Sequence, residues 1–277
     1  MPPAGMRRRV AAIPGTPLPN GILGGCSTVI DVTEDDIHQL LGVEWLGLGC
    51  NPVRDTDWCP PGDESPGEVP VKEFARPEVE SADPVTLYAG VECSTIGWSY
   101  AEAIEHVRAT LLLGEQRGLE EWFWSAVLAP KAIDLTPAAG PVNIAQGVAA
   151  LEGCLAENYG GIGTLHVPAG AAALLGCCNA AVLQGNRLRT LAGNCVVIGA
   201  GYSALNSGPD GTPAEPGTAW LAISGPVLIR RGPLDIVPGN PSQSVDYRYN
   251  DRRVLAERTY VPATTCTVCM IQIQVCP

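Results

Sequence analysis

The sequence predicts an α+β protein with one long helix, one medium helix and mixed, largely antiparallel sheets. Apolar residues recur at helical spacing over residues 99–130 and 143–158. Short apolar runs bounded by glycine, proline or asparagine, a pattern typical of strands and turns, fill most of the remaining chain. The 32 glycines and 25 prolines among 277 residues require many turns and extended segments. With 46% apolar residues, the chain can bury a substantial core.

The N-terminal segment is expected to be an extended arm followed by a short helix. Three prolines between positions 14 and 19 oppose a helix over residues 1–27. They also interrupt the apolar helix that a lipoprotein signal would need before the lipidation-like Cys26. Within residues 28–41, Thr33 is the predicted N-cap, and the three acidic residues after it suit a first helical turn.

A long projecting hairpin is expected next. Residues 43–48 and 85–93 have the apolar character of strands. The segment between them, residues 51–84, is rich in proline and acidic residues and lacks an apolar period. Such an excursion between two strands indicates a projection from the core.

The strongest helix signal begins at a capping box, formed by Ser99 and Glu102. Apolar residues then keep helical spacing as far as Pro130, which is expected to end the helix. Gly114 and Gly118 weaken the helix locally and predict a bend.

The second helix is expected over residues 143–158, with the paired glycines at 160–161 as its C-terminal stop. A strand over residues 163–167 follows. Pro168 then suits the first position of a short, alanine-rich helix.

The C-terminal half is expected to supply the remaining strands. Residues 187–191 and 195–198 flank Ala192-Gly193-Asn194 and predict a hairpin. A loop rich in glycine and proline follows near residues 203–217. The strands predicted beyond it cover residues 218–223, 227–231, 253–261 and 265–275.

The formal net charge of −12 repels phosphate backbones, so specific duplex binding by the folded body is not expected. The one basic run, residues 7–9, is interpreted as a solvated tail. No stretch reaches the roughly 18 apolar residues that a membrane-spanning helix needs, and no membrane partner is predicted.

Eleven cysteines are scattered along the chain, in contrast to the dense spacing of small secreted scaffolds. We expect reduced, mostly buried structural thiols of a cytosolic protein, although the sequence leaves open whether any of them pair. Cys266 and Cys269 have the spacing of half a zinc knuckle. In a strand they would point to opposite faces, and no metal site is predicted.

The sequence contains one G-x-G-x-x-A pattern, formed by Gly199, Gly201 and Ala204 after an apolar run. This pattern binds dinucleotides only when a helix follows the turn. Residues 206–217 contain too many glycines and prolines for such a helix, and no βαβ unit is apparent. We interpret the pattern as a glycine-lined strand exit and predict no cofactor.

No catalytic residue is predicted. The zincin, α/β-hydrolase and P-loop patterns are absent from the sequence. His166 is the histidine considered as a base, with a cysteine such as Cys154 or Cys195 as nucleophile. The structural alternative for His166 is an interface or loop residue.

The order of the segments resembles the major capsid proteins of tailed phages of the Hong Kong 97 type. Those proteins likewise combine an arm, a long hairpin, a long helix, a helix–strand–helix domain and a run of C-terminal strands. The residues that carry the resemblance are 149–152, 160–168, 185–190, 196–198 and 249–258.

The resemblance implies four parts. These are an N-terminal arm at residues 1–42, an extended loop at 43–93, a peripheral domain with a spine helix at 94–139 and 236–277, and an axial domain at 140–235. It also implies a non-enzymatic virion protein that assembles into an icosahedral phage head around the DNA genome.

The implied partners are copies of the chain itself, as hexamers and pentamers in a shell, with decoration or portal proteins as further candidates. The implied place is the virion capsid, assembled in the host cytoplasm, with packaged DNA contacted non-specifically at most. Alternatives are an encapsulin-like nanocompartment shell, a ring-forming head-completion protein, and a nucleotide-dependent or cysteine-based enzyme. Only two lysines are present, so lysine cross-linking of the shell is not predicted.

Overall fold

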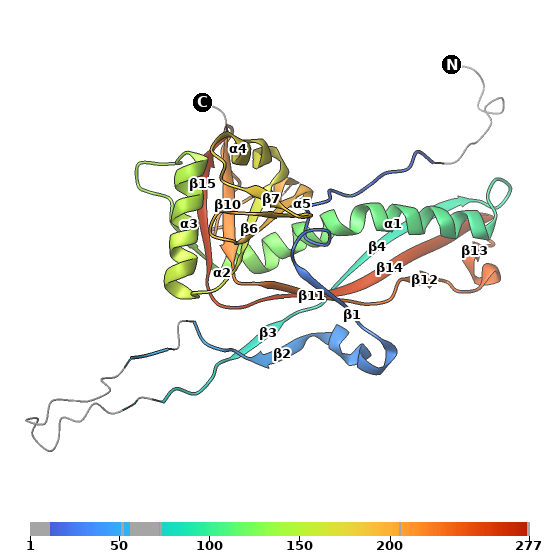
Figure 1. Cartoon of the computed structure of the whole chain (residues 1–277). Helices are drawn as coiled ribbons and strands as arrows, with labels where there is room; N and C mark the ends of the chain where they lie inside the picture. The colour runs from blue at the N-terminus through green and yellow to red at the C-terminus, as the bar shows by residue number, and fades with distance from the viewer. Residues whose placement is uncertain (1–11, 51–52, 56–71, 73, 205, 276–277) are drawn as a thin grey trace, which may run out of the picture.

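The computed structural model describes residues 12–50, 53–55, 72, 74–204 and 206–275. The described chain has a globular part, an elongated part in which a long helix lies along an extended sheet, and a two-stranded hairpin that projects away from both (Figure 1).

The elongated part is a six-stranded sheet covered by helix α1 (Tyr100–Phe123). Its strands are β1 (Thr28–Asp31), β4 (Val85–Ser94), β11 (Val227–Arg231), β12 (Asp235–Val237), β13 (Val245–Asp246) and β14 (Asp251–Thr264). Strand β14 pairs antiparallel with β4, β11, β12 and β13, and β1 adds to β11 in parallel. On β4, exposed and half-buried residues alternate along the whole strand, as expected for a sheet with a helix on one face.

The globular part is a seven-stranded sheet in the order β5-β15-β10-β6-β9-β8-β7. The strands are β5 (Ala132–Asp134), β6 (Thr164–Pro168), β7 (Val182–Gln184), β8 (Arg187–Arg189), β9 (Cys195–Gly199), β10 (Thr218–Ser224) and β15 (Val268–Gln274). Helix α3 (Ile144–Asn158) packs against β10 and β15. The mixed, largely antiparallel sheets predicted from the sequence are confirmed.

The projecting hairpin consists of β2 (Val43–Leu46) and β3 (Val79–Ala82). The remaining helical segments are short: η2 (Glu34–Leu41), η3 (Trp124–Leu128), α2 (Ala129–Lys131), η4 (Ala169–Ala171), α4 (Ala172–Cys177), α5 (Ala200–Ala204) and η5 (Pro241–Ser244).

Helix α1 begins as the sequence predicts. The backbone N–H of Glu102 donates to the Ser99 hydroxyl (3.2 Å), and the Ser99 N–H donates to the Glu102 carboxylate (2.8 Å). The helix runs without a break through both glycines, so the irregular turn lies later than predicted, in η3. Pro130 explains this shift, because it has no N–H for the carbonyl of Ala126 and its ring crowds that turn.

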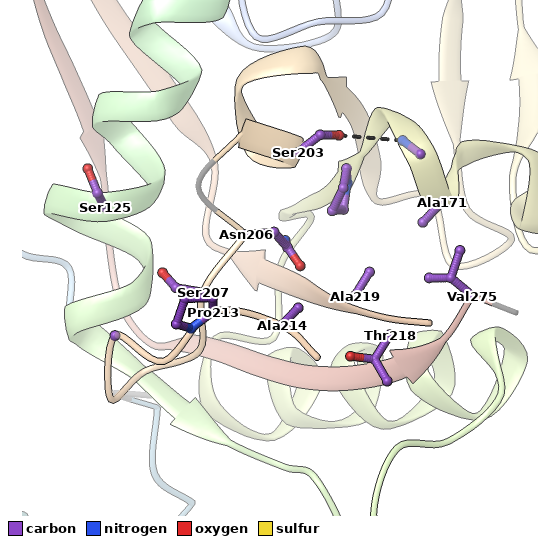
Figure 2. A pocket seen from close by; sticks show the side chains of 13 residues that line it. Ser125, Ala171, Ser203, Asn206, Ser207, Pro213, Ala214, Thr218, Ala219 and Val275 are labelled. Carbon is purple, nitrogen blue, oxygen red and sulfur yellow. Dashed lines mark hydrogen bonds between the residues drawn. The ribbon is translucent and has the colours of Figure 1, made fainter. Parts of the chain in front are cut away.

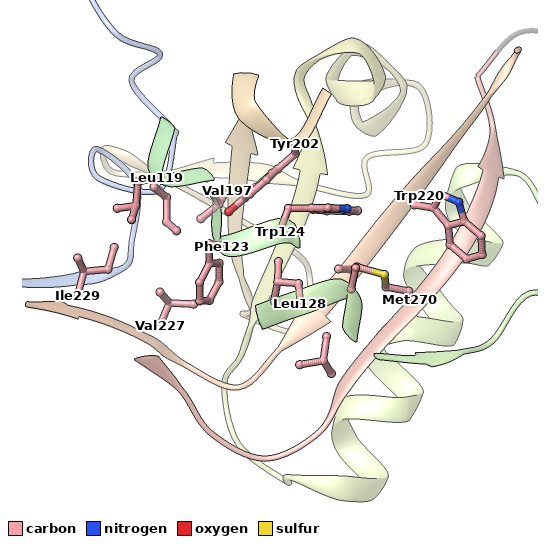
Figure 3. Close-up of a cluster of buried hydrophobic side chains, with 14 of the residues drawn as sticks. Leu119, Phe123, Trp124, Leu128, Val197, Tyr202, Trp220, Val227, Ile229 and Met270 are labelled. Carbon is pink, nitrogen blue, oxygen red and sulfur yellow. The ribbon is translucent and has the colours of Figure 1, made fainter. Parts of the chain in front are cut away.

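The end of the long helix is buried in the core that joins the two sheets (Figure 3). Phe123, Trp124 and Leu128 are fully buried there beside Val197 and Tyr202. Burial of side chains this large stabilises each by roughly 2–3 kcal/mol. A second core lies between α3 and the seven-stranded sheet, and a third lies between α1 and β14.

Two other predicted elements differ from the structure. The helix within residues 28–41 is the 3₁₀ segment η2, and the Thr33 side chain makes no capping hydrogen bond. Because η2 buries no residue, nothing stabilises a regular α-helix there. Strand β8 pairs mainly with β7 across a turn in which Gly185 has φ +62°, and only Arg189 pairs with β9.

Candidate functional site

The G-x-G-x-x-A pattern lies where β9 runs into α5, and two expectations about it are wrong. Residues 200–204 do form a helical turn, because the stretch rich in glycine and proline begins only after them. Strands β6 and β9 are also parallel and are connected through a crossover that contains α4. The local topology is closer to a nucleotide-binding turn than the sequence predicts.

The protein itself fills the space in front of this turn. The Glu120 carboxylate accepts hydrogen bonds from the backbone N–H groups of Gly201 (2.9 Å) and Ile22 (3.0 Å). A Cβ at position 201 would lie 2.2 Å from the backbone oxygen of Arg117, so glycine is needed for the close approach of α1. The Glu120 carboxylate thus accepts a hydrogen bond from the Gly201 N–H, which a phosphate bound at this turn would otherwise accept.

Glu120 is the most perturbed carboxyl group among the described residues. Burial raises its pKa to about 7, although the N–H groups of Gly201 and Ile22 lower it in part. The carboxylate joins helix α1, helix α5 and the N-terminal segment at one point. Glu120 therefore links these three segments inside the core, where solvent does not reach it.

The N-terminal arm is therefore not extended throughout residues 1–27. Residues 18–25 form a compact turn, with the N–H groups of Gly24 and Gly25 donating to the carbonyl of Gly21. Ile22 is fully buried against the end of α1, and the Gln116 amide donates to the carbonyl of Leu18 (3.0 Å). Apolar burial of one isoleucine outweighs the proline preference for extended backbone nearby.

His166 lies on β6 and is fully buried, so the interpretation as an interface or loop residue is wrong. Its Nδ1 is 2.9 Å from the Tyr202 hydroxyl, and its Nε2 is 3.0 Å from the Ser224 hydroxyl. The histidine ring also packs against Phe123. Burial lowers the pKa of His166 to about 3, so the ring is neutral at physiological pH.

His166, Tyr202 and Ser224 form one buried hydrogen-bond network that joins β6 to α5 and to β10. The Ser224 hydroxyl also lies 2.9 Å from the carbonyl oxygen of Gly225. Because all three side chains are fully buried, this network links elements of the core and has no contact with solvent.

Among the described residues, the structure pairs six cysteines, which corrects the expectation of reduced thiols. The disulfides are Cys26–Cys195, Cys50–Cys266 and Cys154–Cys269, with Cα separations of 5.8, 5.5 and 6.7 Å. These separations suit disulfide geometry. The thiols considered as nucleophiles are both bonded. Cys266 and Cys269 have different partners, and the described residues contain no cluster of three or more metal-ligating side chains.

One open cavity of about 530 Å³ lies beside α5 and the start of β10 (Figure 2). Among the described residues, small neutral side chains line it, including Ser203, Asn206 and Thr218, and no titratable group does. The Asn206 amide is already engaged with both backbone groups of Trp220. The described part of the lining therefore supplies neither an acid nor a base.

Exposed apolar side chains also lie on the projecting hairpin. Leu46, Leu48 and Val79 are 65%, 90% and 64% exposed, and Phe74 is also exposed. Several exposed apolar side chains on one projection are typical of an interaction surface. In the described part of the chain, no helix is long and apolar enough to cross a membrane.

Solved structures share this arrangement. The holo-SrpI encapsulin complex from Synechococcus elongatus PCC 7942 aligns with a TM-score of 0.54 and 12% identity, over 99% of this chain and 95% of that one. The capsid of a native GTA particle gives 0.53 and 13%, over 98% and 96%. A chain from Microbacterium phage Oxtober96 gives 0.52 and 13%, over 96% and 95%.

The sequence matches no protein-family model, and no curated protein matches it. The fold is nevertheless shared across nearly the whole chain.

Proposed function

The chain has the Hong Kong 97-type capsid fold, and we propose that it is a self-assembling subunit of an icosahedral phage head. The observation that carries this proposal is the alignment over 96–99% of the chain with a phage protein, a GTA capsid and an encapsulin. The exposed apolar hairpin supports it, because this surface gains burial only when neighbouring copies are present.

We assign four parts to the subunit: an arm at residues 1–42, an extended loop at 43–93, a peripheral domain at 94–139 and 236–277, and an axial domain at 140–235. The six-stranded and seven-stranded sheets support a peripheral and an axial domain. Two adjustments follow from the strand pairing. Strands β5 and β15 belong with the axial sheet, and β11 and β4 belong with the peripheral sheet.

A non-enzymatic role is supported by the neutral side chains that line the cavity and by the full burial of His166. Copies of the chain, as hexamers and pentamers, are the proposed main partners, with portal or decoration proteins as further ones. The proposed place is the virion shell, formed in the host cytoplasm. The net charge of −12 supports no more than non-specific contact with packaged DNA.

A nanocompartment shell is the second candidate, favoured by the TM-score of 0.54 with the encapsulin complex. The contents of native particles separate the two functions. A phage head encloses genomic DNA, whereas an encapsulin-like shell encloses a cargo protein.

Electron microscopy of the purified chain tests the proposal, with closed icosahedral shells as the expected result. The double substitution Leu46→Ser and Leu48→Ser should prevent the formation of closed shells without unfolding the subunit, because both side chains are exposed in the single subunit. Methionine at the same two positions is the matched control and should assemble. Isolated particles that turn over a small molecule would refute the shell function, and open rings would indicate a head-completion protein.

A further inference from the structure

The projecting hairpin is attached to the body at its root by few contacts. Strands β2 and β3 pair with each other over four residue pairs. The Thr265 hydroxyl donates to the Glu80 carboxylate on β3 (2.8 Å), and the Cys50–Cys266 disulfide ties the chain beyond β2 to the same turn. Among the described residues, the hairpin root is therefore joined to the body by contacts of β3 with β14, and to the β14–β15 turn by one side-chain hydrogen bond and one disulfide.

The body side of this attachment is rigid. Cys266 lies between β14, the central strand of the six-stranded sheet, and β15 of the seven-stranded sheet. Its φ of +62° is in the left-handed region, which a cysteine rarely adopts. Glycine or asparagine would suit this turn better, so the backbone strain is consistent with a residue kept for its sulfur.

Access to the three disulfides is unequal. Cys50 is exposed and Cys266 is half-buried. Each of the other two bonds has one buried sulfur-bearing residue, since Cys195 is 5% exposed and Cys269 is fully buried. Thiol–disulfide exchange requires in-line approach to a sulfur atom, so a soluble thiol reaches Cys50–Cys266 first.

We propose that Cys50–Cys266 is a redox-controlled clamp that fixes the projecting hairpin to the body of the subunit. The consequence for a shell rests on the proposed function, whereas the clamp itself is a property of the single subunit. With the bond open, the described root is held by the contacts of β3 with β14 and by the hydrogen bond between Thr265 and Glu80, and the part of the hairpin beyond β2 moves more freely. With the bond closed, the hairpin keeps the orientation in the structure.

Closure needs a two-electron oxidant, and a small-molecule disulfide such as oxidised glutathione supplies it. The exposed Cys50 thiolate attacks one glutathione sulfur and expels a glutathione thiolate. The Cys266 thiolate then attacks the Cys50 sulfur of the mixed disulfide and expels the second glutathione. Both cysteine protons are released, and one disulfide is exchanged for another. Reducing compartments keep the clamp open, and oxidising surroundings close it.

The first experiment uses full-length, unassembled subunits in glutathione buffers of graded redox ratio. Alkylation of the released thiols followed by mass spectrometry should find Cys50 and Cys266 reduced before the other two pairs. Hydrogen exchange of the β2 and β3 amides should become about threefold faster or more in step with that reduction. Equal reduction of all three pairs, or unchanged exchange at the hairpin, overturns the clamp.

Cys50→Ser should exchange rapidly at β2 and β3 in every buffer, because it cannot form the bond. The matched control replaces the exposed Cys177 and Cys178 with serine and should retain the redox response. If Cys50→Ser exchanges slowly, the proposal fails even where the variant folds normally.

The second experiment compares assembled particles. Oxidised wild-type shells should dissociate at a higher guanidinium concentration than reduced ones, and Cys50→Ser shells should show no such difference. Equal resistance of oxidised and reduced wild-type shells contradicts the shell consequence. Absence of any shell refutes the proposed function, while the subunit measurements still decide the clamp.

Discussion

The buried Glu120 carboxyl gives a quantitative test of how the arm is held. Its pKa of about 7 lies well above its ordinary value of 4.5, because burial disfavours the charged form. Between these pH values the folded state holds a proton that the unfolded state has released. The free energy of unfolding therefore rises as the pH falls from 7 to 4.5, by about 3 kcal/mol from this group.

Glu120→Gln removes this titration while keeping an amide oxygen for one of the two N–H donors. We expect the stability of the wild type relative to the variant to increase by about 3 kcal/mol between pH 7.5 and pH 4.5. Urea unfolding of unassembled subunits at several pH values measures this difference. The same substitution at Glu105, exposed on the same helix, is the control for removing a carboxylate outside the core.

The test must compare the wild type with Glu120→Gln, because His166 also makes the free energy of unfolding depend on pH. Its pKa is lowered to about 3, so the folded state loses stability as the pH falls below the ordinary value of 6.5. This effect opposes that of Glu120 between pH 4.5 and 6.5 and is present in both proteins. A wild-type-to-variant difference that stays constant from pH 7.5 to pH 4.5 would refute the assignment of a raised pKa to Glu120.

Further substitutions test the packing around the long helix. Gly201→Ala should destabilise the subunit by about 1–3 kcal/mol, because the added Cβ meets the backbone of α1, whereas Gly153→Ala, with no neighbour within 4 Å, should stabilise it by about 0.5–1 kcal/mol. A thermal melt that ranks them in the opposite order contradicts the close approach of α1 to α5. Arg258→Met leaves the 7%-exposed Glu115 without its ion-pair partner (2.9 Å) and should cost about 3 kcal/mol in urea unfolding. Adding Glu115→Leu should recover most of that loss, and no recovery would show that the pair is not coupled.

Elements with strong local signals could be predicted from the sequence. The capping box of Ser99 and Glu102 places the start of α1 because both hydrogen bonds form between neighbours in the chain. Residues 218–223 and 227–231 could be recognised as strands because they are short apolar runs, although their pairing partners lie far away in the chain. By contrast, α5 is one turn long, and its stability comes from the contact between Gly201 and α1.

The buried site depends on contacts between distant residues, which no local pattern reports. Ile22 and Gly201 reach Glu120 from positions 98 and 81 residues away. Glu120 lies on the same side of α1 as the buried Leu119 and Phe123. The helical spacing of the apolar residues could therefore have indicated that this carboxyl group is buried. The cysteine pairs are separated by 115 to 216 residues, so their scattered spacing gave no connectivity.

The six-stranded sheet joins the beginning of the chain to its end. Strand β1 pairs with β11, and β4 pairs with β14 along its whole length. Sheets closed by such distant segments form late, because the intervening chain must first be made and ordered. On a ribosome, β4 stays without its partner until β14 emerges. Synthesis itself then sets the time at which the sheet completes, so that a chain interrupted before residue 251 lacks the antiparallel partner of β4.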